Sequence, residues 1–158
     1  MELREYRSGD LPELLTLFYN TVHIVNARDY TPDQLDAWAD GTPDTAAWDR
    51  SLREHRTLVA VQDGRMVGFA DLAADGHLDR LYVHHAWQGR GVATRLCDAL
   101  ESGSDAPRLY TEASLTARDF FLRRGYRVVQ RQQVVRHGVA MTNFRMEKIR
   151  TQRSCNDA

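Results

Sequence analysis

The stretch at residues 82–96, YVHHAWQGRGVATRL, decides how the rest of the chain is interpreted. An apolar, strand-like segment runs into a helical pattern, and the junction between them, QGRGVA at 88–93, carries two glycines and an alanine. Backbone N–H groups at a helix start lack intrahelical acceptors and lie at the positive end of the helix dipole. A phosphate can reach them where no side chain blocks its approach. The junction predicts an anion-binding turn, although a purely structural strand-to-helix turn would need similar residues.

Length, charge and cysteine content narrow the class of protein. The 158 residues favour one domain, which we expect over 1–150, followed by a polar tail over 151–158. Lys plus Arg numbers 21 and Asp plus Glu numbers 22, a balance that does not favour nucleic acid or a membrane surface as partner. The two cysteines and the scattered histidines show no disulfide or metal-ligand pattern, and no signal peptide or membrane helix is apparent. We therefore expect a cytoplasmic protein with no metal.

Hydrophobic spacing predicts the element order β, α, α, α, β, β, β, α, β, α, β, β. Asp63-Gly64 between two apolar runs predicts a hairpin, and His137-Gly138 a second turn between the last two strands. Thr31 and Thr42, each followed by proline, predict helix starts, and Ser114 is a candidate helix cap. The order predicts a mixed α/β domain with an antiparallel centre, not a doubly wound dinucleotide fold.

Two segments and the element order resemble the GNAT N-acetyltransferases. QGRGVA resembles motif A of the family, and ASLTARDFFLRRGYRVV at 113–129 resembles motif B. Residues 138–148 and the Tyr30–Trp38 spacing are similar to a bacterial subgroup of mostly uncharacterised members. The resemblance implies a mostly antiparallel central sheet of about six or seven strands with helices on both faces, its fourth and fifth strands splayed apart. The motif B positions are Ala117, Phe120, Phe121, Gly125 and Tyr126.

The same resemblance implies acetyl-coenzyme A as cofactor. Leu81 and Val83 would offer main-chain groups to the pantetheine arm, in the manner of an added strand. Ser114 stands where many relatives carry an asparagine that contacts the cofactor, and Phe121 would pack on the pantetheine or simply belong to the core. The residues expected around the pyrophosphate are Gln88, Gly89, Arg90, Gly91, Val92, Ala93 and Thr94.

Acetyl transfer to an amine needs a group that takes a proton, since an amine with a pKa of about 10 is protonated at neutral pH. Strand alternation predicts that His77, Asp79, Leu81 and Val83 share one face, with Tyr82 on the other. His77 aligns with the position of a catalytic glutamate in some relatives, and Asp79 would act as base or bind the substrate cation. Alternatively, His77 lies at an exposed strand end and Asp79 pairs with an arginine. Because position 121 is phenylalanine rather than tyrosine, the acid that would protonate the thiolate stays unassigned.

Aromatic residues of the helical region could line an acceptor pocket for a small primary amine. They are Tyr19, His23, Tyr30 and Trp38, although helical spacing also fits Trp38 as a core residue. The predicted function is an acetyl-coenzyme A-dependent N-acetyltransferase that acts on such an amine by direct attack on the thioester. The alternative is a catalytically weak acyl-coenzyme A sensor, and the choice between monomer and homodimer stays open.

Overall fold

The computed structural model describes residues 1–150, and the predicted tail over 151–158 lies outside these described residues. Within 1–150 seven strands form two antiparallel sheets, one in the order β1-β2-β3-β4 and the other in the order β5-β7-β6. The predicted mixed α/β class is confirmed. The strands are β1 (Glu2–Glu5), β2 (Arg56–Gln62), β3 (Arg65–Leu72), β4 (Leu78–Val83), β5 (Arg108–Ser114), β6 (Arg127–Arg136) and β7 (Val139–Ile149).

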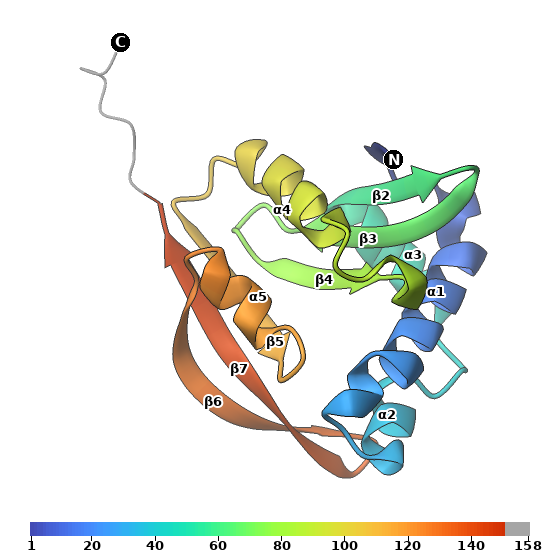
Figure 1. Ribbon diagram of the computed structural model, residues 1–158, viewed down its shortest axis with the longest axis vertical. Coiled ribbons are helices and arrows are strands. Elements are labelled where there is room, and N and C mark those ends of the chain that lie inside the picture. Colours follow the sequence, from blue (N-terminus) through green and yellow to red (C-terminus); the bar gives the residue numbers. More distant parts are fainter. Residues whose placement is uncertain (151–158) are drawn as a thin grey trace.

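The two sheets meet where β4 and β5 run side by side in the same direction, and they separate immediately (Figure 1). One isolated parallel bridge pairs His77 with Tyr110. The Tyr110 N–H donates to the carbonyl of Gly76 at 3.0 Å, and the Thr111 hydroxyl donates to the carbonyl of Leu78 at 2.8 Å. Past these contacts β4 and β5 diverge into a V whose closed end, the apex, lies at His77 and Tyr110. The expected splaying of the fourth and fifth strands is confirmed.

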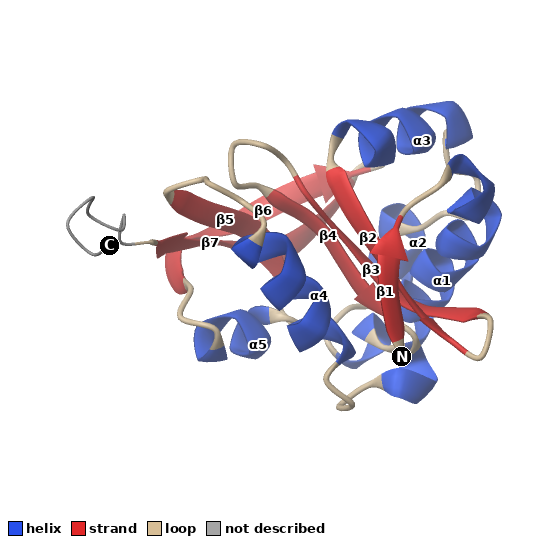
Figure 2. Ribbon diagram, turned by 90° about the horizontal axis from the view of Figure 1, so that it is seen from above, coloured by secondary structure: helices blue, strands red, loops and turns tan. Residues whose placement is uncertain are grey.

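Helices cover both faces of the sheets (Figures 1 and 2). One core cluster packs α4 and α5 against one face, and a second packs α1, α2 and α3 against the other. No helix among residues 1–150 is both long and apolar enough to cross a membrane. The helices are α1 (Leu11–Ile24), α2 (Pro32–Trp38), α3 (Thr45–Glu54), α4 (Val92–Ser102) and α5 (Arg118–Arg123).

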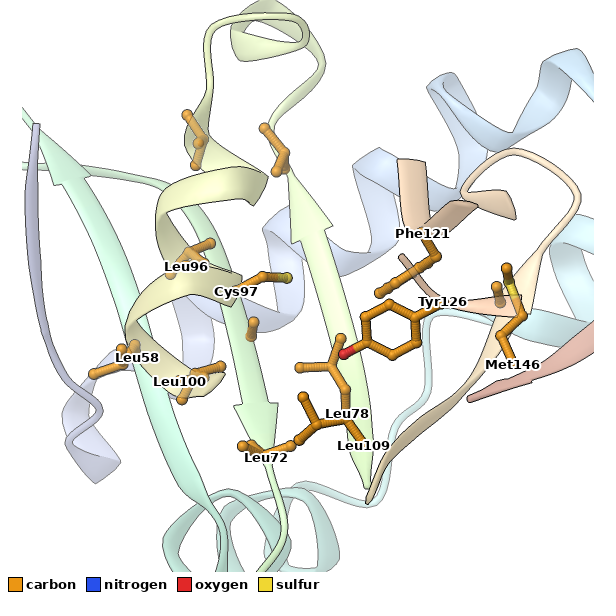
Figure 3. Close-up of a cluster of buried hydrophobic side chains, with 14 of the residues drawn as sticks. Leu58, Leu72, Leu78, Leu96, Cys97, Leu100, Leu109, Phe121, Tyr126 and Met146 are labelled. Atoms are coloured by element: carbon orange, nitrogen blue, oxygen red, sulfur yellow. The ribbon is translucent and has the colours of Figure 1, made fainter. Parts of the chain in front are cut away.

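The core beneath α4 fixes the position of the V. Leu96 and Leu100 of α4 are completely buried against Leu58 of β2 and Leu72 of β3, and Leu78 of β4 joins the same cluster (Figure 3). Burying side chains of this size stabilises the fold by about 1.5–3 kcal/mol each. The start of α4 is thereby held rigidly beside the end of β4.

Local sequence signals correctly predicted most of the turns and helix starts named above. Asp63 and Gly64 have φ angles of 52° and 76°, as a two-residue hairpin turn requires, and Thr31 accepts a hydrogen bond from the Gln34 N–H to cap α2. Two cap predictions were wrong. Asp44, not Thr42, caps α3 by accepting from the Ala47 N–H at 3.1 Å. Ser114 ends β5, where its hydroxyl accepts from the Ala117 N–H in a local turn, and α5 begins only at Arg118.

Candidate functional site

A cleft of about 620 Å³ opens from the V between β4 and β5. The start of α4 and the residues around α5 line one side of this cleft, while α1, the turn after it and Trp38 of α2 line the other. The cleft therefore passes through the plane of the sheets and contacts both layers of helices. A ligand that enters from the α4 side can meet a second ligand that enters from the α1–α2 side.

The start of α4 is open to a ligand. Gly89 and Gly91 have φ angles of 72° and 81°, a left-handed backbone conformation that glycine adopts with little strain. A side chain built at either position would meet nothing within 4 Å, so the space in front of the loop is free. Gly91 occupies the N-cap position and supplies no side-chain acceptor to the helix N–H groups. The junction is thus a bare turn at the positive end of α4, and it borders the cleft. Its binding of an anion stays a prediction.

Most residues expected around a pyrophosphate line the cleft, and one does not. The guanidinium of Arg90 lies 4.9 Å from the centre of the Trp87 ring, and Arg90 is not part of the cleft wall. The side chain of Gln88 donates to the carbonyl of Val83 at 2.7 Å, which holds the loop against the end of β4. The residues that line the cleft are Gln88, Gly89, Gly91, Val92, Ala93 and Thr94.

The main chain of β4 faces the cleft at alternate residues. The His84 N–H donates to the carbonyl of Val67, and Val83 pairs with Gly68 in the register of β3 and β4. Since main-chain groups of an antiparallel strand point alternately to either side, those of Leu81 and Val83 point away from β3 and into the V. The Val83 carbonyl already accepts from the Thr21 hydroxyl and from Gln88. Its N–H and the main chain of Leu81 are the groups placed to bind an extended ligand.

Phe121 and Ser114 lie on the β5 side of the cleft. Phe121 is 2% exposed and packs edge-on against Phe120 and Tyr126 at 5.2 and 5.1 Å between ring centres, and it also forms part of the cleft wall. Both interpretations of Phe121, core residue and ligand wall, therefore agree with its position. Ser114 lines the cleft with its hydroxyl held by the Ala117 N–H.

A bulge in β4 overturns the predicted alternation. Asp71 pairs with Arg80 and Leu72 pairs with Leu78, so Asp79 is an extra residue without a partner on β3. The Asp79 carboxylate lies 3.5 Å from the Arg80 guanidinium, on the side of α3, instead of sharing a face with Leu81. Tyr82 lines the same cleft as Asp79, contrary to the expected opposite placement. An extra residue shifts alternation by one, and a single sequence gives no sign of where it falls.

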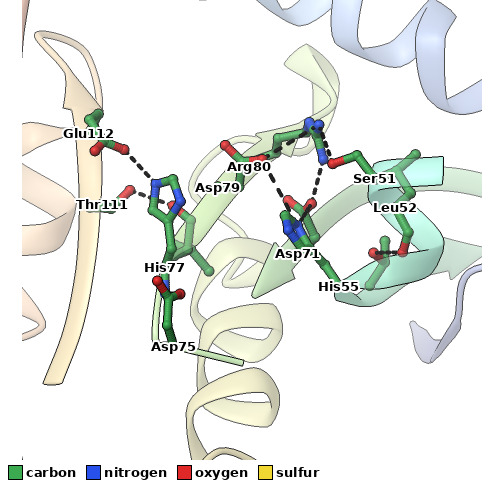
Figure 4. Close-up of polar contacts among 12 residues, drawn as sticks. Ser51, Leu52, His55, Asp71, Asp75, His77, Asp79, Arg80, Thr111 and Glu112 are labelled. Carbon is green, nitrogen blue, oxygen red and sulfur yellow. Dashed lines mark hydrogen bonds and ion pairs between the residues drawn. The ribbon is translucent and has the colours of Figure 1, made fainter. Parts of the chain in front are cut away.

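His77 is connected to the cleft by Glu112, a residue that was not predicted from the sequence. Its Nε2 lies 2.5 Å from Oε2 of Glu112 on β5, and Glu112 lines the cleft while His77 does not (Figure 4). The imidazole stacks on the Tyr110 ring at 4.7 Å between centres and 5° between planes. The hydrogen bond with Glu112 raises the pKa of His77, and the same bond lowers the pKa of Glu112. Alternation in RLYTEAS, with Leu109, Thr111 and Ala113 in the core, would have placed Glu112 on the opposite face.

A second histidine–carboxylate pair lies on the other flank of Asp79. His55 Nδ1 lies 2.9 Å from Oδ2 of Asp71, and the Arg80 guanidinium donates to the same oxygen at 2.5 Å (Figure 4). Arg80 also donates to the Ser51 hydroxyl at 3.0 Å. Asp71 is completely buried, and its other oxygen, Oδ1, has no hydrogen-bond partner among the described residues. Because the guanidinium already supplies the positive charge, this group forms an ion-pair cluster between α3, β3 and β4.

The four residues expected in an acceptor pocket do not share one environment. Trp38 lines the cleft, and its indole N–H donates to the Tyr82 hydroxyl at 3.2 Å. Tyr30 is buried beneath Trp38, where its hydroxyl donates to the Thr142 carbonyl and accepts from the Leu115 N–H. His23 binds the Ala39 carbonyl at 2.8 Å outside the cleft, and Tyr19 lines a separate hollow on the far side of Trp38. Of the four, Trp38 alone is part of the cleft wall.

Comparison with known proteins agrees with this geometry. A family described as "Acetyltransferase (GNAT) domain" matches residues 26–148. "Uncharacterized N-acetyltransferase YafP" of Escherichia coli is 32% identical over 146 residues, covering 92% of this chain and 94% of the relative. The crystal structure of a GCN5-related N-acetyltransferase from Rhodopseudomonas palustris is 37% identical, covers 94% of each chain and has a TM-score of 0.89. PaiA N-acetyltransferase from Thermoplasma acidophilum, solved with coenzyme A, has a TM-score of 0.75 at 16% identity over 94% of this chain and 98% of its own, a likeness of fold. The chain belongs to the GNAT family of acetyltransferases.

Proposed function

We propose that this GNAT acetyltransferase transfers the acetyl group of acetyl-coenzyme A to a primary amine of a small molecule. Family membership carries the acetyltransferase activity and its coenzyme A cofactor, and the acceptor is the part proposed. The observation that carries the proposal is the cleft that runs from the bare start of α4 through the V to Trp38 on the opposite layer. The α4 side suits the cofactor and the α1–α2 side suits an acceptor.

On the cofactor side, the N–H groups from Gln88 to Thr94 would bind the pyrophosphate, with Gly89 and Gly91 giving it room. The Leu81 main chain and the Val83 N–H would pair with the pantetheine arm as an added strand. Phe121 and Ser114 would complete the wall along β5. The thioester would then lie toward the apex of the V, because the strands close there.

On the acceptor side, Trp38 and Tyr82 offer an aromatic wall to the carbon skeleton of the amine. Asp79 and His77 are the ionisable residues we propose near the reacting nitrogen, Asp79 as a cleft residue and His77 through Glu112. A cleft of about 620 Å³ that must also hold the acetyl-pantetheine arm leaves room for a small acceptor. We expect a small molecule rather than a folded protein surface for that reason.

A pair of glycine variants tests the cofactor site. Gly91→Val and Gly64→Val both place a side chain at a left-handed glycine with open space around it, the first at the start of α4 and the second in the β2–β3 hairpin. Calorimetric titration with acetyl-coenzyme A should show at least about a tenfold loss of affinity for Gly91→Val, since the new side chain blocks the N–H groups. Gly64→Val is the control for backbone strain and should keep wild-type affinity. Equal affinities in all three proteins would refute the proposed pyrophosphate site.

The alternative function, an acyl-coenzyme A sensor with weak catalysis, is favoured by one observation. Phe121 carries no hydroxyl that could protonate the leaving thiolate. Release of free thiol from acetyl-coenzyme A, measured with phenethylamine, spermidine and lysine amide, distinguishes the two functions. Amine-dependent release supports the enzyme, while cofactor binding with no release above the amine-free rate favours the sensor.

We further propose a bacterial cytoplasmic setting and self-association along β6. The relative YafP is a protein of the bacterium Escherichia coli. β6 is an edge strand of its sheet, with Val129 and Val135 exposed at 44% and 69%. An edge of this kind can pair with a second copy. Sedimentation of the wild type beside a Val129→Lys variant tests the assembly, and a monomer in both cases would exclude it.

A further inference from the structure

We propose that Glu112 is the catalytic group that takes the proton of the acceptor ammonium, with His77 as the residue that positions it. The inference rests on the proposed acetyl transfer and adds a residue on β5 to His77 and Asp79. Three features of the structure carry it: the place of Glu112 at the apex of the V, its contact with His77, and the difference between this pair and the Arg80 cluster.

The first feature is position. Tyr110 is level with His77 in the parallel bridge, and β4 and β5 run in the same direction, so Glu112 stands level with Asp79 just past the closed end of the V. Leu109, Thr111 and Ala113, which alternate with Glu112 along β5, are buried beneath α4 and α5. Glu112 therefore points toward the opposite side of the sheet. Glu112 therefore lines the cleft on the side of Trp38, where the acceptor would enter.

The second feature is the way in which His77 holds Glu112. The 2.5 Å contact fixes Oε2, which leaves Oε1 as the oxygen free to meet the amine. His77 is itself held, because its ring lies parallel on Tyr110 and its main-chain N–H donates to Asp75, whose second oxygen accepts from the Tyr110 hydroxyl. A carboxylate oriented by a locked partner loses little freedom when it binds a substrate.

The third feature is that both partners of this pair are titratable groups, whereas the Arg80 cluster includes a permanent charge. Glu112, Asp75 and Asp79 all face His77 and favour its protonated form, while Arg145 of β7 acts on Glu112 from the other side. When His77 is neutral, the pair has room for one more proton. Asp79 differs because its neighbour Arg80 holds a permanent charge and cannot release a proton. Asp79 is thus suited to bind the ammonium, and Glu112 to deprotonate it.

Acetyl transfer through Glu112 conserves atoms and charge. The ammonium gives one proton to Oε1 of Glu112, and its freed lone pair forms a C–N bond to the thioester carbonyl carbon. The C–S bond breaks, and its electron pair leaves with sulfur, which takes a proton from water. The second ammonium proton is lost to water as the amide forms, and Glu112 returns its own proton to solvent through the open mouth of the cleft. No oxidant or further reactant is needed.

Glu112→Gln tests the catalytic role. The variant keeps the size of the side chain and its bond to His77, and we expect kcat/KM for thiol release with the same three amines to fall by about 100-fold or more. The affinity for acetyl-coenzyme A should stay at the wild-type value. Glu2→Gln is the control, because Glu2 is exposed on the edge strand β1 and is absent from the cleft wall, so its activity should stay within about twofold. An active wild type matched by Glu112→Gln would overturn this inference alone, whereas a wild type that binds cofactor but releases no thiol would overturn the proposed function as well.

His77→Gln tests the positioning role by a measurement that a merely structural residue would not change. In the wild type, kcat/KM should rise with pH through the raised pKa of His77, above the usual 6.5, because a protonated His77 weakens Glu112 as a base. His77→Gln keeps a donor for Glu112 but cannot titrate, so this acidic limb should disappear while a limb set by the amine itself remains. NMR titration of the histidines should show the His77 pKa falling in Glu112→Gln. A limb unchanged in His77→Gln, or a His77 pKa unchanged in Glu112→Gln, would refute the pair.

Discussion

Two histidine–carboxylate pairs flank Asp79, and they differ in what surrounds the carboxylate. The Glu112 side chain is 34% exposed and faces the cleft, whereas Asp71 is completely buried between β3 and α3. The ion pair of Glu112 is with His77, a group that can release its proton, while Asp71 also accepts from Arg80, which keeps its charge. A histidine and a carboxylate therefore serve the proposed chemistry at the apex of the V and the architecture behind it. Burial and the identity of the third partner make the difference.

The buried cluster around Asp71 also affects the shape of the cleft. Arg80 follows the bulged Asp79 directly, and its guanidinium is anchored to Asp71 and Ser51. The ring of Trp48 lies 4.6 Å from the same guanidinium. This anchoring fixes the strand at the point where alternation shifts, so the buried cluster holds the bulge and the bulge directs Asp79. The architectural pair thus supports the catalytic pair from the opposite flank.

The largest effect expected from this comparison is on stability, at the buried pair. Asp71→Ala leaves the Arg80 guanidinium and His55 without their carboxylate, and we expect the free energy of unfolding to fall by about 3–5 kcal/mol. Glu112→Gln, measured in parallel, should lose less than about 1 kcal/mol because its pair is partly solvated. Urea unfolding monitored by tryptophan fluorescence measures both. Similar losses in the two variants would show that burial does not separate the pairs.

A smaller effect is expected from two buried threonines, Thr111 beside Glu112 and Thr57 opposite Asp71 in the sheet. The Thr111 hydroxyl donates to the Leu78 carbonyl at the apex, and the Thr57 hydroxyl donates to the Leu52 carbonyl beneath α3. Thr111→Val and Thr57→Val keep the side-chain shape, and each should cost about 1 kcal/mol of unfolding free energy. Thr111→Val should also lower kcat by about tenfold, since the apex loosens and Glu112 is its neighbour. Unfolding curves and thiol-release rates measure the two effects, and equal kcat values in the two variants would mean that the apex need not be rigid.

The sequence predicted the architecture better than the reacting residues, for a physical reason. Hydrophobic period, turn glycines and the bare 88–93 loop are local signals, and the order of elements, the hairpin at Asp63-Gly64 and the open start of α4 all follow from them. The face of Asp79 depends on a bulge, and a bulge depends on which residues of two strands pair. The partner of His77 lies 35 residues away on β5, so its identity requires the V itself. A local sequence pattern does not reveal contacts between residues that lie far apart in the chain.

The smallest expected effect is on the pH dependence of stability. Asp71 raises the pKa of His55 and Glu112 raises that of His77, both above the ordinary value of 6.5, while Arg80 opposes the first shift. A group whose pKa is raised on folding contributes stability that is fully present below 6.5 and is lost as pH rises through the folded-state pKa. The free energy of unfolding should therefore decrease with pH above 6.5, and His55→Gln or His77→Gln should each remove part of the slope.

Salt separates the two contributions to that slope. Added sodium chloride should weaken the His77 part, because the Glu112 carboxylate is in contact with solvent and its charge is screened. The His55 part should persist, because the carboxylate that it faces is wholly inside the protein. Unfolding curves of the two glutamine variants at several pH values, with and without salt, measure each part. If salt removed the slope from His77→Gln, where the His55 pair alone remains, Asp71 would be reachable by ions and the contrast between the two flanks would fail.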